Sequence, residues 1–210
     1  TAAEAAAEES RAEETEAAAA ADIETVTPGK LTVATSPDFA PYEFYAIGED
    51  GTPKLSGFDM DLAQYIADYL GLELEVVTVD FDGVLSELQT KSVDLGMAGL
   101  SPDEKRMGIM DFSDLYYMGG QSLVTVKDNA EKFNTFEAVN KPDVSVGAQV
   151  GSIQMDLANE NTPDADIVGL PKVTDIISEL LTGKMDAAFI ETDVAKSYQK
   201  NYPELELVMD

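Results

Sequence analysis

Residues 57–79, GFDMDLAQYIADYLGLELEVVTV, contain a helix pattern that passes directly into a strand pattern. In the helix part, the apolar side chains recur at a spacing that predicts one buried face: Leu62, Ile66, Tyr69 and Leu70. Asp59 is a candidate cap for the start of this helix, and Gly71 stands where a helix typically ends. Residues 72–79 then predict a strand, so the stretch forms one helix–strand unit.

The flanking segments extend this unit into a β-α-β-α-β order. Residues 31–35 and 93–99 predict two further strands, and residues 80–90 predict a second helix whose inner face carries Val84, Leu85 and Leu88. The Pro-rich residues 36–44 between the first strand and the first helix predict a loop. Parallel strands need crossover connections, so this order predicts a parallel sheet with helices on both faces.

The second half of the chain repeats the alternation. We expect strands at 121–126, 143–149, 164–170 and 186–190, and helices at 154–161, 173–183 and 194–202. The middle helix has a clear apolar face: Val173, Ile176, Ile177 and Leu180. The sequence therefore predicts an α/β fold of two units joined near 115–127. Ligands bind in crevices at the carboxyl ends of strands in such folds.

Composition excludes several classes of function. The chain has 210 residues, with 41 acidic and 13 basic ones, which gives a formal net charge of −28. Nucleic acids need clustered Lys and Arg, so they are not expected partners. No Cys or His is present, which excludes disulfides, thiolate chemistry, His-based triads and the usual zinc sites. We expect neither a metal nor a cofactor, since no calcium-loop motif is found; a carboxylate-only site for calcium or magnesium is the alternative.

Residues 1–28 differ from the rest of the chain. Residues 1–22 are almost entirely Ala and Glu, and the turn signal Thr27-Pro28-Gly29 ends the segment. Helix propensity is high there, but the segment has little apolar surface to bury. We expect a tether outside the fold. A coiled-coil helix is the alternative, although no Leu, Ile or Val seam supports it.

Several motifs together resemble one protein family. The quoted helix start, GFDMDLAQYIA at 57–67, is preceded by FAPYEF at 39–44. VDL at 93–95 leads into GLS at 99–101, and DFSDLYY at 111–117 has Leu115 where the similar motif has proline. VGAQVGS at 146–152 resembles the opening of a second lobe. Over roughly residues 30–210, the chain resembles the family 3 solute-binding proteins, the extracytoplasmic amino-acid receptors of ABC importers.

The resemblance implies a two-lobed fold of the type II periplasmic-binding-protein class. Each lobe would be a mostly parallel sheet flanked by helices, with lobe 1 at 29–120 and lobe 2 at 121–210. The similar proteins continue past the position of Asp210 and return to the first lobe, so we expect this chain to be incomplete relative to them. The implied protein is a monomer that works with an ABC permease, either in the periplasm or lipid-anchored at the outer face of the membrane.

Arg106 is the candidate group for a ligand carboxylate. Its planar guanidinium can hold a carboxylate through two parallel hydrogen bonds, and it follows a strand-end Gly-Leu-Ser. A surface arginine in the Lys105-Arg106 pair is the alternative. By resemblance, the Gly99 carbonyl accepts from the ligand ammonium and Ser101 bonds the carboxylate or the amine. Ordinary turn chemistry would also explain Gly99 and Ser101.

The second lobe supplies candidates for the opposite side of the ligand. The residues that open a helix there, Gly151, Ser152, Ile153 and Gln154, have free N–H groups that favour an anion, although Ser152 also suits a simple N-cap. Glu191 follows an apolar strand. The resemblance implies that it pairs with the ligand ammonium. A solvated carboxylate among many acids is the alternative.

The ligand side chain would lie between two aromatic residues. Phe39 and Phe81 correspond to the family's aromatic pair, although such residues also serve as core. Relatives that bind cationic amino acids often carry an acid where this chain has Ser36. Gln149 and Gln154 suit a polar neutral ligand, whereas the negative field attracts cations. The expected ligand is therefore a free L-amino acid, polar or cationic, and we leave Tyr42 as core or rim.

The expected mechanism is hinge closure without catalysis. The ligand would dock on Arg106, Gly99 and Ser101, after which the lobes close around it, with residues 123–126 as one hinge crossing. Two alternatives stay open: an enzyme that resembles dehydratases of cyclic amino acids, and the ligand-sensing domain of a receptor. The sequence has no distinctive catalytic pair of carboxyls that would favour the enzyme.

Overall fold

The computed structural model describes residues 23–209, so the expected tether lies outside the described residues up to residue 22. The first lobe contains a parallel sheet in the order β5-β1-β6. Its central strand β1 (Lys30–Thr35) pairs in parallel with β5 (Glu73–Thr78) and β6 (Leu95–Gly96). The predicted strand at 93–99 is therefore shorter than expected, and its last residues are free to form a turn.

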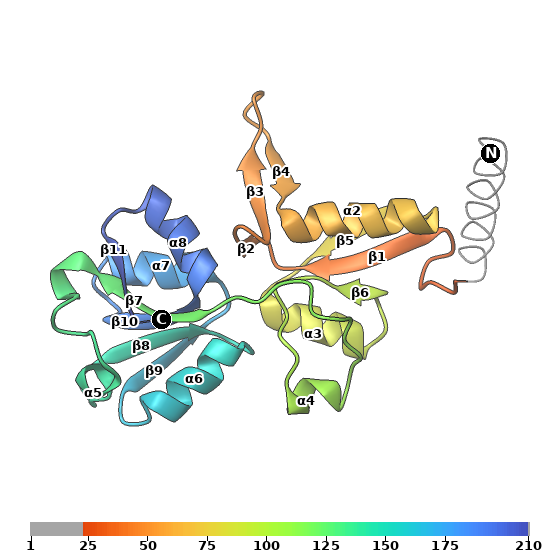
Figure 1. Ribbon diagram of the computed structural model, residues 1–210. Helices are drawn as coiled ribbons and strands as arrows, with labels where there is room; N and C mark the ends of the chain where they lie inside the picture. The colour runs from red at the N-terminus through yellow and green to blue at the C-terminus, as the bar shows by residue number, and fades with distance from the viewer. Residues whose placement is uncertain (1–22, 210) are drawn as a thin grey trace, which may run out of the picture.

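Two helices cover opposite faces of this sheet. Alternate residues of a strand point to opposite sides, so Leu31 and Val33 of β1 pack with α2 (Phe58–Leu70), while Ala34 packs with α3 (Phe81–Gln89). Figure 1 shows α2 and α3 on the two sides of β1. The predicted parallel arrangement with helices on both faces is confirmed for this lobe.

The buried face of α2 differs from the predicted one. The side chains that contact the sheet most closely are Met60, Ala63 and Ala67, whereas Tyr69 is 57% exposed. Small Ala side chains let the helix approach the strands, which rotates the larger apolar residues toward the edges. Asp59 is not the N-cap, because Gly57 occupies that position. The helix ends at Gly71, which adopts the left-handed conformation as expected.

A small antiparallel sheet replaces the predicted loop after β1. It comprises β2 (Asp38–Phe39), β3 (Glu43–Ile47) and β4 (Pro53–Ser56), paired in that order. Figure 1 shows the β3–β4 hairpin projecting away from both lobes, and β2 lying at the boundary between them. The prolines led us to predict a loop here instead of this sheet. The alternation of polar and apolar residues in β3, EFYAI, is nevertheless typical of a strand with one exposed face.

The second lobe is a five-stranded sheet in the order β11-β7-β10-β8-β9. The strands β8 (Ser145–Gln149), β9 (Asp166–Leu170) and β10 (Ala187–Glu191) are parallel neighbours. The strand β7 (Gln121–Val126) runs antiparallel to both β10 and β11 (Leu205–Met209). Four of the five strands thus run in the same direction and β7 runs against them, and β11 is an element that sequence reasoning missed.

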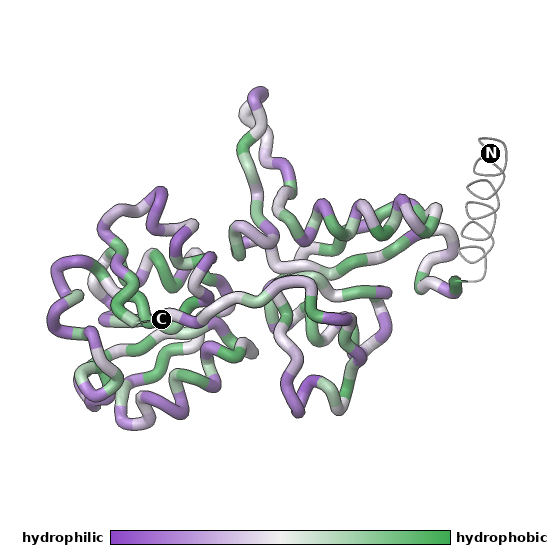
Figure 2. The backbone as a smooth tube through the Cα atoms, in the orientation of Figure 1, coloured by the Kyte–Doolittle hydropathy of each residue, from purple (hydrophilic) through white to green (hydrophobic). Residues whose placement is uncertain are grey.

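Helices enclose this second sheet on both faces as well. Ala188 and Ile190 of β10 pack with α7 (Val173–Leu181) and α8 (Thr192–Asn201), whereas Ala187 and Phe189 pack on the side of α5 (Phe136–Val139) and α6 (Ile153–Asn161). The predicted inner face of α7 is confirmed, since all four residues are buried. Figure 2 shows hydrophobic residues concentrated along these strands.

The connection between the lobes precedes β7. After the short helix α4 (Glu104–Met107), residues 111–120 have no helix or strand and run from one lobe to the other (Figure 1). Residues 123–126, which we expected to be a hinge crossing, instead lie inside β7, where they pair with two neighbouring strands. A short 3₁₀ helix, Lys127–Asn129, follows β7. Over residues 23–209, no helix combines the length and apolar character that spanning a bilayer requires.

Candidate functional site

The carboxyl ends of strands from both lobes meet at one cavity of about 100 Å³. In the first lobe, the chain after β1, β5 and β6 contributes Phe39, Phe81 and Gly99. In the second lobe, the ends of β8 and β10 contribute Gln149 and Glu191. This position agrees with the general rule for open α/β sheets.

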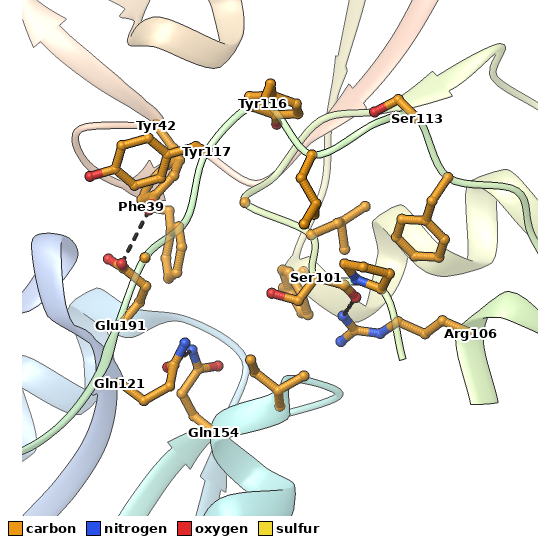
Figure 3. Close-up of a pocket in the computed structure, with 18 of the residues that line it drawn as sticks. Phe39, Tyr42, Ser101, Arg106, Ser113, Tyr116, Tyr117, Gln121, Gln154 and Glu191 are labelled. Carbon is orange, nitrogen blue, oxygen red and sulfur yellow. Dashed lines mark hydrogen bonds between the residues drawn. The ribbon is translucent and has the colours of Figure 1, made fainter. Parts of the chain in front are cut away.

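The turn after β6 depends on a glycine. Gly99 has a φ of +58°, and a Cβ there would lie 2.8 Å from Cε1 of Phe39. A larger residue would therefore be strained by its backbone and would displace the aromatic ring that lines the cavity. Ser101 follows in the same turn and also lines the cavity (Figure 3).

The Arg106 guanidinium is held by one ion pair and two hydrogen bonds. Its Nε lies 3.1 Å from Oδ2 of Asp103 in the ion pair, and Nη1 donates to the Ser101 carbonyl at 2.8 Å. Nη2 donates to the Gly151 carbonyl of the other lobe at 3.0 Å. Arginine carries five N–H donors, so Nη1 and Nη2 each keep one N–H for a ligand carboxylate.

Burial shapes the electrostatics of Arg106. The residue is only 6% exposed, and this desolvation lowers the pKa of the guanidinium, while Asp103 and Asp156 oppose the shift. Arginine keeps its charge despite such a shift because its ordinary pKa is so high. The guanidinium also lies over the Phe81 ring, with Cζ 5.7 Å from the ring centroid.

Glu191 lies on the opposite side of the cavity from Arg106, as Figure 3 shows. Its Oε2 accepts from the backbone N–H of Val194 at 2.8 Å, which caps α8. Its Oε1 accepts from the Tyr42 hydroxyl of the first lobe at 3.1 Å. Burial raises the pKa of Glu191, and these two donors oppose the rise. Each carboxylate oxygen has a further lone pair that an ammonium can approach.

Nine of the twelve predicted ligand-binding residues line the cavity: Phe39, Phe81, Gly99, Ser101, Arg106, Gln149, Ile153, Gln154 and Glu191. Gly151, Ser152 and Ser36 do not line it. Ser152 is buried, accepts from the Met155 N–H as the N-cap of α6 and donates to the Gln149 carbonyl at 2.7 Å. The Gly151 carbonyl accepts a hydrogen bond from the Arg106 guanidinium.

Ser36 faces a second and larger cavity of about 680 Å³, whose walls also include Asp38, Asp80, Asp82 and Lys172. Its hydroxyl donates to Oδ1 of Asp38 at 3.2 Å. The side chain is therefore separated from the cavity that holds Arg106. The expected ligand contact of Ser36 therefore stays a prediction, and in this structure its hydroxyl bonds the neighbouring carboxylate of Asp38.

Sequence reasoning missed the contribution of the interlobe segment. Residues 112–117, Gly119 and Gln121 all line the cavity. A Cβ on Gly119 would lie 2.2 Å from Oε1 of Glu191, so a larger residue would displace the Glu191 carboxylate. Tyr42, which we left as core or rim, is both buried and part of the cavity wall. The DFSDLYY motif was recognised, but its role as a cavity wall depends on where the chain crosses between lobes.

The amide side chains in the cavity already have partners. The Gln154 Nε2 donates to Oε1 of Gln121 at 2.7 Å, and the Gln149 Nε2 donates to the Pro171 carbonyl at 3.1 Å. These bonds orient the amides and leave their remaining groups for water or ligand. The amides of Gln149 and Gln154 therefore form a polar part of the cavity wall whose orientation is fixed by hydrogen bonds.

A pair of buried acids supports the Gly99 turn from behind. Asp59 accepts from the Gly99 N–H at 3.2 Å and from the Tyr116 hydroxyl at 2.9 Å. Glu43, which is fully buried near Asp59, has no hydrogen-bond partner for either carboxyl oxygen among the described residues. Burial and the nearby Asp59 charge raise the pKa of Glu43 well above its usual range. The neutral, protonated form of Glu43 is therefore favoured.

The cavity thus combines one buried cation, one buried anion on the opposite wall, and aromatic surfaces between them. Such a site suits a small zwitterion that has an apolar or extended side chain. Among residues 23–209, no cluster of three or more acidic side chains is arranged to hold a metal ion. The two charges are not in contact with each other, so each can serve a separate group of a ligand.

Comparisons with known proteins agree with this geometry. The chain is 33% identical over 179 residues to the arginine-binding extracellular protein ArtP of Bacillus subtilis, covering 84% of this chain and 67% of that protein. It is 29% identical over 177 residues to the cyclohexadienyl dehydratase of Pseudomonas aeruginosa, covering 84% of this chain and 65% of the enzyme. The chain therefore spans about two thirds of the length of these relatives.

A solved structure is also similar. The amino acid ABC transporter substrate-binding protein AbpA of Streptococcus pneumoniae, bound to L-arginine, has a TM-score of 0.82 and 36% identity, covering 85% of this chain and 74% of that one. Residues 31–205 match the sequence profile of one family, a range that contains every cavity residue named above. The resemblance seen in the motifs is therefore confirmed, and the chain belongs to the bacterial extracellular solute-binding proteins, family 3.

Proposed function

We propose that this protein binds a free amino acid between its lobes, outside the cytoplasm, and delivers it to an ABC importer. The observation that carries the proposal is the cavity with Arg106 on one side and Glu191 on the other. The guanidinium fits the ligand carboxylate, and the carboxylate of Glu191 fits the ammonium. Family membership and the relatives named for amino-acid binding support this assignment.

Binding proceeds by closure of the lobes. The ligand first contacts Arg106 and the Gly99–Ser101 turn of the first lobe, and the second lobe then brings Glu191 and the start of α6. Closure excludes water, so the ion pairs strengthen as the effective dielectric constant falls. The extended segment 111–120 is where we place one hinge, because it has no regular structure that would resist bending.

The proposed ligand is a cationic amino acid, with arginine as the first candidate. Arginine is named for a curated relative and is bound in a similar solved structure. The net charge of −28 attracts cations, and Phe39 and Phe81 offer aromatic faces to an extended cationic side chain. A polar neutral amino acid is the alternative, supported by the amides of Gln149 and Gln154.

Calorimetric titration with L-arginine and the other amino acids tests the proposal. Arg106→Ala removes the carboxylate partner, so affinity should fall at least about thirtyfold, as for other buried charge pairs. Lys105→Ala is the matched control, because it removes the adjacent positive charge, which is 83% exposed and pairs with Asp156. The control should bind within about threefold of the parent, since exposed ion pairs contribute little. Equal affinities for Arg106→Ala and the parent would overturn the proposal.

One observation supports a second candidate, a dehydratase-like enzyme. Glu191 is a buried carboxyl of raised pKa in the cavity, as a general acid would be, and one relative is named a dehydratase. However, Tyr42 and Val194 both donate to this carboxyl, which favours its ionised form. We therefore assign it to ammonium binding. Turnover of a prephenate-like substrate that is lost in Glu191→Gln would favour the enzyme.

The partner and location follow from the proposed transport role. The closed form of a monomer would be the form that the ABC permease recognises. The protein would work in the periplasm, or at the outer face of the membrane through a lipid anchor. Capture of the closed, arginine-loaded protein by its permease in detergent, compared with Arg106→Ala, would test this step.

A further inference from the structure

We propose that Asp38 is a latch that stabilises the closed arrangement of the lobes without touching the ligand, an inference that rests on the proposed binding function. Asp38 belongs to β2, which lies at the boundary between the lobes (Figure 1). It is absent from the walls of the cavity that holds Arg106 and Glu191, and it lines the second cavity instead. Its action is therefore on closure and not on ligand recognition.

The Asp38 side chain caps a helix of the other lobe. Its Oδ2 accepts from the Val173 N–H at 2.5 Å, and it also receives the Thr174 N–H. These are the first N–H groups of α7, which have no partner inside the helix. The residue at the N-cap position, Lys172, makes no side-chain capping bond. The carboxylate of Asp38, which is 135 positions from Val173 in the sequence, thus caps α7 in place of Lys172.

The capping is favourable for charge as well as for hydrogen bonding. The N-terminus of a helix carries a partial positive charge that a carboxylate stabilises. Asp is among the preferred capping residues, whereas Lys is not. When the lobes separate, both the N–H groups and the carboxylate return to water. The interaction therefore belongs to the closed arrangement alone.

A second bond ties the same residue to another helix. The Tyr198 hydroxyl of α8 donates to the Asp38 carbonyl at 2.8 Å. Ser36 donates to Oδ1 of Asp38 and so fixes the side chain with Oδ2 toward α7. Asp38 is thus joined to two helices of the second lobe through its side chain and its backbone. This also gives Ser36 a role as a positioning residue for the latch.

Loss of the latch should change closure and affinity together. Removal of an N-cap side chain changes a folding equilibrium by about twofold to thirtyfold. The same factor applies to the ratio of closed to open molecules, because the cap exists only in the closed form. Ligand affinity is proportional to the fraction of molecules that are closed. When most ligand-free molecules are open, the affinity therefore falls by the same factor as the ratio of closed to open molecules.

The lobe separation can be measured in the protein without ligand. The chain has no cysteine, so Asp61→Cys on α2 and Glu160→Cys on α6, both exposed, give one label site on each lobe. Pulsed electron resonance between spin labels then reports the distribution of distances. Asp38→Ala should shift the distribution toward longer distances, and it should weaken L-arginine binding by about twofold to thirtyfold in calorimetry.

Asp80→Ala is the matched control. It removes one acid from the wall of the same cavity, and its pair with Lys172, at 3.7 Å, is about half exposed on both sides. Exposed pairs contribute little, so the distribution should change less than in Asp38→Ala. Asp38→Asn, which keeps a good capping oxygen, should fall between the parent and Asp38→Ala and serves if the alanine variant does not fold.

An unchanged distance distribution together with unchanged L-arginine affinity in both Asp38 variants, or equal changes in Asp80→Ala, would overturn the latch. This result is distinguishable from failure of the proposed function. The distances are measured without ligand, whereas the proposed function fails only if amino acids do not bind or if Arg106→Ala binds them as the parent does.

Discussion

At the residue scale, Gly99 combines a left-handed backbone conformation with a crowded position for any side chain. Gly99→Ala should lower the free energy of unfolding by about 1–2 kcal/mol from the positive φ alone, with a further loss from the clash with Phe39. Gly183→Ala is the control, because its φ is +71° but nothing lies within 4 Å of the new Cβ. Denaturant unfolding of both variants measures the difference. If both variants lost the same free energy of unfolding, the Phe39 ring would move aside without destabilising the fold.

The buried acid pair predicts a pH dependence of stability at a second residue. The native pKa of Glu43 lies well above its ordinary value of 4.5, so the folded protein keeps a proton that the unfolded chain has lost. Folding stability from this group is full below pH 4.5 and is lost as the pH rises through the native pKa. Glu43→Gln puts a neutral side chain of nearly the same shape at this position, and it does not titrate.

The Glu43→Gln variant should therefore lose less stability than the parent between acid and alkaline pH, and it should be the more stable protein at pH 8. Urea unfolding across this range is the measurement. Glu160→Gln, which neutralises an exposed carboxyl on α6, should follow the parent. Parallel pH profiles for Glu43→Gln and the parent would show that Glu43 does not hold the proton.

At the scale of the element, the start of α6 separates structural from ligand roles. Ser152 caps this helix and does not line the cavity, so Ser152→Ala should cost about 1 kcal/mol of stability. Affinity for L-arginine should change by less than about threefold, because no ligand contact is lost. Thermal unfolding and calorimetry measure the two effects. Ser86→Ala, within α3, is the control and should leave stability nearly unchanged.

The helices also show how far periodicity can predict packing. For α7, the four apolar residues at helical spacing are all buried, because the helix lies fully against the sheet. For α2, the same reasoning chose Tyr69, which is exposed, and missed the small residues Ala63 and Ala67. Periodicity marks large apolar side chains, whereas close helix–sheet contact favours small ones. The short strands of the β2–β4 sheet were missed because prolines suggested a loop.

At the scale of the whole molecule, the net charge of −28 predicts a salt effect on association with a cationic ligand. The attraction extends over a Debye length of about 10 Å at 0.1 M salt and shrinks as salt rises. The association rate of L-arginine, followed by tyrosine fluorescence in stopped flow, should therefore fall with ionic strength. L-glutamine has no net charge and serves as the control. Identical salt profiles for both would exclude steering by charge.

Ligand binding should also stabilise the whole molecule. An amino acid that binds only the folded form at 100 times its dissociation constant adds about 2.7 kcal/mol. A thermal-shift screen of the twenty amino acids should show this gain for L-arginine, and Arg106→Ala should abolish it. A larger gain with a neutral amino acid would reassign the ligand class while keeping the site.

The sequence by itself determined the α/β alternation, the two lobes, the family and most of the cavity residues, since strand and helix patterns and local motifs are properties of neighbouring residues. Tertiary structure alone decided which of those residues face the cavity. Ser36 bonds Asp38, and Ser152 caps α6 instead of lining the cavity. Tyr42 donates a hydrogen bond to Glu191, and residues of the segment 111–120 line the cavity. These outcomes depend on contacts between residues far apart in the chain, whose relative positions no local pattern records.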